Sequence, residues 1–218
     1  MKETTRQKVD DFLVRYPKLA PLKTDLEKAV QMLCDSYHQG GKLLICGNGG
    51  SASDAEHIVG ELMKGFLKKR EVRGALAEKI RKAAPESADY LLKGLQGALP
   101  AVSLCDEVAL NSAFANDQAP DLAFGQSVLG LGNVGDVLLG ISTSGNSTNV
   151  LHAFEVAKAK GLKTLALTGA TGGKIKAQAL ADVTLCAPDT ETYRIQEYHL
   201  PIYHMLCIAV EEEFFGEA

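Results

Sequence analysis

Two amphipathic helices are predicted at the start of the chain. Over the first 39 residues, apolar side chains recur at every third or fourth position, the period of an α-helix with one buried face. Pro17 and Pro21 separate two such segments, and Gly40-Gly41 ends the second. The apolar positions are Val9, Phe12, Leu13 and Tyr16 in the first segment, and Leu22, Leu26, Val30, Leu33 and Tyr37 in the second.

After residue 39 the pattern changes to short apolar runs separated by longer helical stretches. Each run is too short for a helix and continuously apolar, as expected of a strand buried on both faces. Repeated alternation of strand and helix predicts parallel strands with right-handed crossovers and helices on both faces. The chain is therefore expected to be one α/β domain over residues 1–218, closed by a helix over about 192–215 that Pro201 interrupts. The predicted strands are 43–46, 101–104, 137–141, 164–167 and 183–186.

Residues 67–97 do not fit the simple alternation. They begin with a basic stretch and continue as two short helical patterns separated by Pro85, which predicts an inserted helical hairpin or lid. One interpretation is a solvated helical elaboration. The alternative is that basic side chains of its first part reach an anionic substrate. Those side chains are Lys68, Lys69, Arg70 and Arg73.

Composition and charge narrow the class of protein. Hydrophobic residues make up 46% of the 218 residues and the formal net charge is −4, so the chain can bury a full core but offers no overall basic surface for nucleic acid. No apolar run approaches the length of a membrane span, and the charged N-terminus lacks the apolar segment of a secretory signal. Five dispersed cysteines without a CxxC pair predict free thiols in a reducing cytoplasm.

Two polar loops follow predicted strands and precede predicted helices. The first, CGNGGS at 46–51, would let a ligand approach the backbone closely, and the helix start behind it favours an anion. It matches neither the P-loop nor the dinucleotide-binding pattern, and a turn without a ligand is the alternative. The second, STSGNS at 142–147, supplies hydroxyl donors suited to phosphate oxygens, although its Ser and Asn residues could simply be helix caps. Two such loops at one edge of a parallel sheet favour a phosphate site.

Two pairs of side chains could carry chemistry. His57 and Glu61 are four residues apart on the helix predicted after the first loop, so they share a face and could bind a divalent metal or transfer protons. An exposed ion pair is the simpler interpretation of that spacing alone. Gln196 and His204 lie on one broad side of the last helix, about 80° apart. His199 falls on a different face and is expected to be structural.

Four motifs together resemble the phosphoheptose isomerases of the sugar isomerase (SIS) domain family. They are GNGGSASDAEHIVGEL, FANDQAPDLAF, LLGISTSGNSTNVLHAF and RIQEYHLPIYH, and the likeness covers nearly the whole chain. The resemblance implies a flavodoxin-like, doubly wound five-stranded parallel sheet and a homotetramer with active sites at subunit interfaces. It also implies that sedoheptulose 7-phosphate and D-glycero-D-manno-heptose 7-phosphate are interconverted at a site containing zinc.

The resemblance also assigns roles to individual residues. The zinc ligands implied by the motifs are His57, Glu61, Gln196 and His204, and the proton-transfer pair is Glu61 with His204. Because ligation lowers the basicity of a carboxylate, Glu61 would hold its two roles alternately. The substrate-contacting positions implied are Asn48, Gly49, Gly50, Ser51, Glu61, Asn116, Asp117, Ser142, Thr143, Ser144, Ser147 and Gln196.

The residue types agree with an aldose–ketose isomerisation through an enediol, which needs proton-transfer groups and a means of holding the developing negative charge. Two departures from the family pattern concern the substrate more than the reaction: the long 67–97 segment and Pro201 between Gln196 and His204. Two alternatives stay open. One is a non-catalytic relative that binds another protein or a phosphosugar as a regulator, and the other is an isomerase or lyase for a different phosphosugar.

Overall fold

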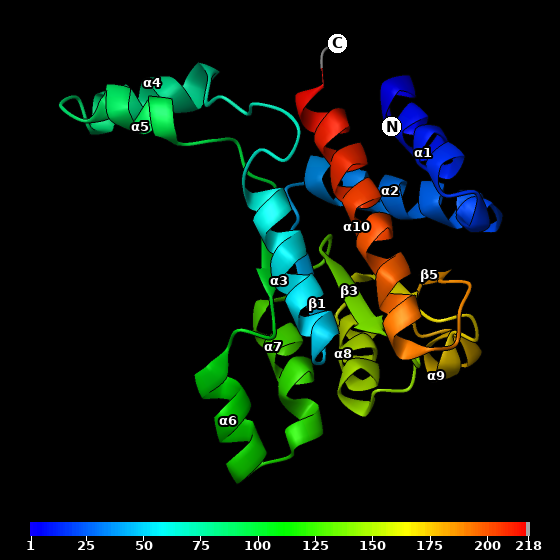
Figure 1. Cartoon of the computed structure of the whole chain (residues 1–218). Helices are drawn as coiled ribbons and strands as arrows, with labels where there is room; N and C mark the ends of the chain where they lie inside the picture. The colour runs from blue at the N-terminus through cyan, green and yellow to red at the C-terminus, as the bar shows by residue number, and fades with distance from the viewer. Residues whose placement is uncertain (217–218) are drawn as a thin grey trace.

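The computed structural model describes residues 1–216 and places five strands in one parallel sheet of order β2-β1-β3-β4-β5 (Figure 1). Every neighbouring pair is parallel, so the predicted doubly wound α/β fold is confirmed. Each predicted apolar run lies within two residues of an observed strand at both ends. The strands are β1 (Leu43–Gly47), β2 (Ala101–Ser103), β3 (Val137–Ser142), β4 (Lys163–Thr168) and β5 (Val183–Cys186).

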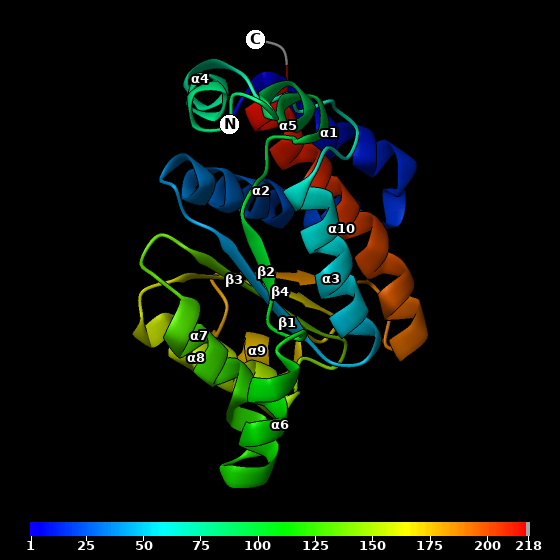
Figure 2. The same cartoon turned by 90° about the vertical axis from the view of Figure 1, so that its left-hand side faces the viewer.

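Helices cover both faces of the sheet (Figure 2). Alternate residues of β1 enter different cores: Leu43 and Ile45 pack with α2, α3 and α10, whereas Leu44 and Cys46 pack with α7 and α8. The helices are α1 (Glu3–Arg15), α2 (Lys23–His38), α3 (Gly50–Met63), α4 (Gly74–Ala83), α5 (Ala88–Gly94), α6 (Val108–Asp117), α7 (Ala123–Leu131), α8 (Thr148–Ala159), α9 (Gly173–Ala177) and α10 (Thr192–Phe215), with short 3-10 helices at Pro17–Leu22 and Pro120–Leu122.

The last helix differs from its prediction. Pro201 lies inside α10 without ending it, and the helix runs unbroken from Thr192 to Phe215. Proline removes one backbone hydrogen bond, but the turns on its C-terminal side are held by burial, because Ile202, Tyr203 and Met205 are each at most 3% exposed. Packing therefore outweighs the lost bond, and Gln196 and His204 are carried by one continuous element.

Residues 67–97 form the predicted helical pair, α4 and α5, which projects from the domain next to the C-terminal end of α10 (Figures 1 and 2). The basic residues at its start are engaged within the chain. Arg70 is buried against Glu211, while Lys69 and Arg73 pair with Glu71. Lys68 pairs with Glu212 of α10.

All five cysteines are free thiols, as predicted. Within residues 1–216, no helix has both the length and the apolar character required to span a bilayer.

Candidate active site

The two polar loops lie side by side at the carboxyl edge of the sheet. β1 and β3 are adjacent, with Gly47 paired to Ile141, so the loop before α3 and the loop before α8 leave the sheet together. Gly49 has a φ of +57°, a left-handed conformation that glycine adopts without strain. The N–H groups of Ser51, Ala52 and Val150 already donate to carbonyls just before their helices. Within residues 1–216 this leaves the N–H groups of Gly50, Thr148 and Asn149 without a partner at the starts of α3 and α8. This edge therefore has the geometry of an anion site.

Side chains join the two loops. Asn48 and Asn149 exchange two amide hydrogen bonds, of 2.9 and 2.8 Å, between the first loop and the first turn of α8. Within the second loop, the hydroxyls of Ser142 and Ser147 are 2.9 Å apart. The Asn48–Asn149 pair fixes the spacing of the loops before any ligand arrives.

The remaining loop residues occupy different environments. Ser51 is buried, and its N–H donates to the Asn48 carbonyl. Ser144 is exposed, and its hydroxyl oxygen accepts from the N–H of Asn146. Thr143 is half-buried, and its carbonyl accepts from the N–H of Gly169 after β4. The exposed side of the second loop is thus open to a ligand.

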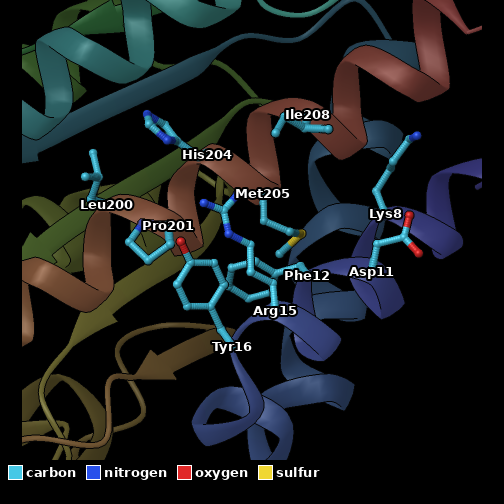
Figure 3. Close-up of a pocket in the computed structure, with 10 residues that line it drawn as sticks. All are labelled: Lys8, Asp11, Phe12, Arg15, Tyr16, Leu200, Pro201, His204, Met205 and Ile208. Atoms are coloured by element: carbon cyan, nitrogen blue, oxygen red, sulfur yellow. The ribbon is translucent and has the colours of Figure 1, made fainter.

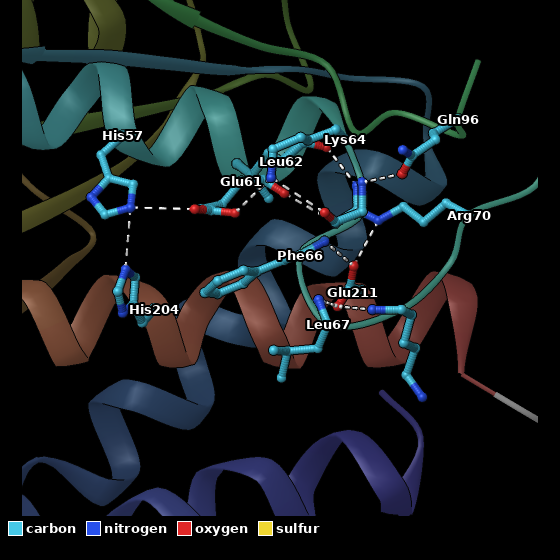
Figure 4. Close-up of polar contacts among 12 residues, drawn as sticks. His57, Glu61, Leu62, Lys64, Phe66, Leu67, Arg70, Gln96, His204 and Glu211 are labelled. Carbon is cyan, nitrogen blue, oxygen red and sulfur yellow. Dashed lines mark hydrogen bonds and ion pairs between the residues drawn. The ribbon is translucent and has the colours of Figure 1, made fainter. Parts of the chain in front are cut away.

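A cluster of two imidazoles and a carboxylate lies between α3 and α10 (Figure 4). His57 Nε2 is 3.3 Å from Glu61 Oε1 and 3.5 Å from His204 Nε2. The Glu61 side chain is 15% exposed and also receives Lys64 Nζ at 3.4 Å. His204 of the second sequence pair thus meets His57 and Glu61 across two helices, which an isolated surface ion pair would not do.

The hydrogen bonds of Tyr203 set the orientation of His57. The Tyr203 hydroxyl donates to Asp54 Oδ1 at 3.2 Å and is 3.0 Å from His57 Nδ1. Because that hydroxyl has one proton and an ionised carboxylate only accepts, Nδ1 donates to the hydroxyl oxygen, and in the neutral ring Nε2 then holds the lone pair. Burial and the facing His57 ring lower the pKa of His204, which favours its neutral form.

Gln196 lies against the first loop. A Cβ placed on Gly50 would come 2.6 Å from Gln196 Nε2, so any other residue there would displace this amide from its position. Gln196 therefore lies where the loop before α3 meets the N-terminal part of α10.

Asn116 and Asp117 lie apart from the other candidates. They end α6, which has no buried residue and extends away from the domain (Figures 1 and 2). Asn116 Nδ2 donates to Asp117 Oδ1 at 2.6 Å, and within residues 1–216 no hydrogen bond joins either side chain to the two loops. Their contact with substrate stays a prediction.

The donor atoms suit a divalent ion in part. Ligand bonds of about 2.0–2.1 Å in a tetrahedral zinc site give ligand–ligand spacings of about 3.3–3.4 Å, close to the two distances measured from His57 Nε2. Over residues 1–216, however, no three His, Cys, Asp or Glu side chains are already grouped as a complete metal site. The types of the donor atoms suit zinc, and their closure into one complete site stays a prediction.

His204 also borders a pocket between α1 and α10 (Figure 3). The pocket has a volume of about 440 Å³ and is lined by apolar side chains, including Phe12 and Met205, and by the basic side chains of Lys8 and Arg15. None of the polar-loop residues line it. It adjoins the histidine cluster but is separate from the anion edge.

His199 is structural, as predicted. It is fully buried, and its Nε2 is 3.2 Å from the carbonyl oxygen of Thr168 at the end of β4. Since a carbonyl only accepts, Nε2 carries the proton. Burial lowers the pKa of His199 to about 4, so the ring is neutral near pH 7. His199 attaches α10 to the same sheet edge that carries the loops.

Known proteins with similar sequences agree with this arrangement. The SIS domain family model matches residues 15–94 and 95–169. This chain belongs to the SIS domain family. A phosphoheptose isomerase of Helicobacter pylori strain P12 is 41% identical over 196 residues, covering 90% of this chain and 88% of the relative. One from Synechocystis is 38% identical over 192 residues, covering 88% and 84%.

Solved structures support the same family. The phosphoheptose isomerase from Francisella tularensis superposes with a TM-score of 0.74 at 29% identity, covering 91% of each chain. The one from Neisseria gonorrhoeae has a TM-score of 0.68 at 31% identity, covering 96% of this chain and 92% of that one. The predicted family and the predicted class of enzyme, a phosphosugar isomerase, are confirmed.

The sequence did not predict the residues that hold the site residues in position through hydrogen bonds. Asn149 lies two positions after the second loop and carries no apolar pattern, although its place in the first turn of α8 directs it toward the first loop. Asp54 and Tyr203 are far apart in sequence, and only the packing of α3 on α10 brings them together at His57.

Proposed function

We propose that this SIS domain protein interconverts sedoheptulose 7-phosphate and D-glycero-D-manno-heptose 7-phosphate. The observation that carries the proposal is the cluster of His57, Glu61 and His204 on two helices that both begin beside the phosphate-suited loops. The names of its relatives support a heptose phosphate as substrate. A regulator that only binds a phosphosugar would have no need for this cluster.

The loops would hold the phosphate and leave the sugar to extend toward the cluster. N–H groups at the starts of α3 and α8 and the hydroxyls of the second loop would donate to phosphate oxygens. Ser142, Thr143, Ser144 and Ser147 are the proposed hydroxyl contacts, with Asn48, Gly49, Gly50 and Ser51 on the other loop. Asn116 and Asp117 are proposed to contact the sugar.

Glu61 and His204 are proposed to move the protons. On the path from ketose to aldose, a base removes a proton from carbon 1, an enediol forms, and a proton returns to carbon 2 while the hydroxyl proton moves from O1 to O2. Glu61 is largely enclosed, and the lowered pKa of His204 keeps its imidazole available as a base. Lys64 Nζ lies 3.4 Å from Glu61 Oε2, beside the proposed pair.

We further propose that His57, Glu61, Gln196 and His204 hold a zinc ion. The lone pair of His57 Nε2, fixed by the hydrogen bond of Nδ1 with Tyr203, supports that assignment. When bound, a divalent cation polarises the sugar carbonyl and stabilises negative charge on the enediol oxygens. The family likeness also leads us to propose a homotetramer in the cytoplasm.

The decisive experiment follows isomerisation of sedoheptulose 7-phosphate by NMR, with metal content measured by elemental analysis. Glu61→Gln is expected to lower kcat by about 10³-fold, because a general acid–base group is lost, while sugar-phosphate binding survives. Glu56→Gln is the matched control, an exposed carboxylate one residue from His57 on the same helix, and should retain wild-type turnover.

Two results would contradict the proposal. Full activity of Glu61→Gln would remove this carboxylate from the mechanism. Wild-type protein that neither binds metal nor turns over the heptulose phosphate, even with added zinc, would refute the heptose isomerase assignment, and turnover of a different phosphosugar would redirect it.

A further inference from the structure

The segment that follows α3 contains a buried carboxylate with an unusual set of partners. Glu211 of α10 is 1% exposed and accepts hydrogen bonds from three consecutive backbone N–H groups, those of Phe66, Leu67 and Lys68, at 2.8 to 3.1 Å. Arg70 Nε is a fourth donor, at 2.8 Å. One side chain of α10 thus binds the whole turn by which the chain leaves α3 (Figure 4).

Arg70 completes the connection from the other side. Its guanidinium is 1% exposed and donates to the carbonyl oxygens of Leu62 and Glu61, at 2.6 and 3.1 Å. These are carbonyls of the last turn of α3, which have no partner within the helix, and a cation there also complements the helix dipole. Arg70 therefore caps α3 at the backbone of Glu61.

Both connections lead to the proton-transfer pair. Arg70 holds the backbone of Glu61 itself. Glu211 holds the N–H of Phe66, whose ring packs against the imidazole of His204 with 5.3 Å between centroids. Glu211 also lies seven residues after His204, about 20° away around the helix, so it marks the same face of α10.

We propose that Arg70 and Glu211 are positioning residues, which set α3 against α10 so that Glu61, His57 and His204 meet at the observed distances. This inference rests on the proposed function for its catalytic meaning. The exposed basic residues Lys69 and Arg73 pair instead with Glu71 of their own segment. Arg70 thus acts on the site through the helix backbone rather than by reaching a substrate.

A planar guanidinium is needed for this arrangement. Arg70 directs separate N–H groups at Glu211, Leu62 and Glu61, and its plane also lies over the ring of Phe215, 4.8 Å from the centroid. A lysine has one ammonium group and cannot reach the two carbonyls and the carboxylate together with this geometry. Arg70→Lys therefore retains the buried positive charge but removes the planar set of N–H donors.

The test compares Arg70→Lys with Arg73→Lys, an exposed arginine three residues away that serves as the matched control. For Arg70→Lys we expect kcat to fall at least about 10-fold and zinc affinity to fall about 10- to 100-fold, as when supporting partners of metal ligands are lost. KM for the sugar phosphate should change less than about 2-fold, because the loops are not touched. Arg73→Lys should match the wild type in all three.

A readout independent of turnover separates this proposal from the proposed function. The side-chain NMR signals of His57 and His204 should shift in Arg70→Lys and stay in place in Arg73→Lys. If the wild type has no isomerase activity but these signals move, the positioning role stands and the proposed reaction fails.

The proposal is overturned if Arg70→Lys loses thermal stability alone, with kcat, zinc affinity and the two histidine signals unchanged, since the pair would then be merely structural. Glu211→Gln provides a second route should Arg70→Lys not fold. It retains the shape of the side chain but exchanges one acceptor oxygen for a donor, and the same loss of kcat with preserved KM is expected.

Discussion

The candidate site combines two regions that are held in very different ways. The loops, α3 and α10 are fixed by the chain's own contacts: Asn48 pairs with Asn149, Arg70 with Glu211, and His199 with the end of β4. The projecting helices α4, α5 and α6 have almost no such contacts. Only Ala77 and Ala88 are buried in the α4–α5 pair, and α6 has no buried residue.

The difference shows which parts of the site one chain can build alone. Phosphate-suited loops and the Glu61–His204 cluster are in place within a single chain. Asn116 and Asp117, on α6, are not brought to the loops by any contact of the described chain. A role for these two residues therefore requires a ligand or another copy of the chain to complete their surroundings, consistent with the proposed tetramer.

The largest effect is expected on the stability of the packed region, when the pH is lowered and His199 becomes protonated. The pKa of this ring is lowered from 6.5 to about 4 by burial, so the folded state binds the proton less well than the unfolded state. Its stabilising contribution is complete above pH 6.5 and is lost as the pH falls toward 4. As the pH falls from 7.5 to 5, protonation of His199 should lower the free energy of unfolding by about 2 kcal/mol.

Urea unfolding of His199→Gln at both pH values measures this contribution. The free energy of unfolding of the variant should change less between the two pH values than that of the wild type, by about that amount, because the variant has no ring to protonate. His152→Gln, which removes a partly exposed histidine from α8, is the control and should keep the wild-type pH dependence. Equal pH dependence in wild type and His199→Gln would show that folding does not lower the pKa of this ring.

The packed region was also the part that the sequence predicted best, and the reason is physical. Continuously apolar runs such as 43–46 and 137–141 have one stable location, the centre of a parallel sheet, and this fixes where the loops behind them must lie. The prediction that Pro201 interrupts the last helix was wrong. The sequence shows the proline and its missing N–H, but it does not show that Ile202 and Tyr203 are buried and hold the helix together. Arg70 looked like a surface cation for the same reason, since its partner Glu211 is 141 residues away.

A smaller effect is expected where the two loops are joined. Asn149→Ala removes both amide hydrogen bonds with Asn48, each worth about 0.5–1.5 kcal/mol. The loops would then be ordered only when the phosphate binds, and KM should rise about 10-fold, equivalent to about 1.4 kcal/mol. Steady-state kinetics on the sugar phosphate would measure this, with kcat nearly unchanged.

Asn133→Ala is the control for Asn149→Ala, because Asn133 precedes β3 at the opposite edge of the sheet and its amide makes only a 3.5 Å contact. It should leave KM as in the wild type. A fall in kcat rather than a rise in KM for Asn149→Ala would mean that the loops orient the reacting carbons instead of holding phosphate.

The smallest effect is expected from removing the projecting pair α4–α5. Glu71 and Gln96 bridge at its base, and Gln96 Oε1 accepts from the N–H of Gly65, so the ends of the excised segment already lie together. Replacing residues 74–94 with two glycines leaves Arg70 and its partners in place, and kcat and KM should stay within about 2-fold of the wild type. A severalfold loss of kcat, with the histidine NMR signals and zinc affinity of the wild type, would show that the pair covers the site during turnover. That result would mean that α4 and α5 take part in catalysis. It would also make the 67–97 segment a determinant of which sugar reacts.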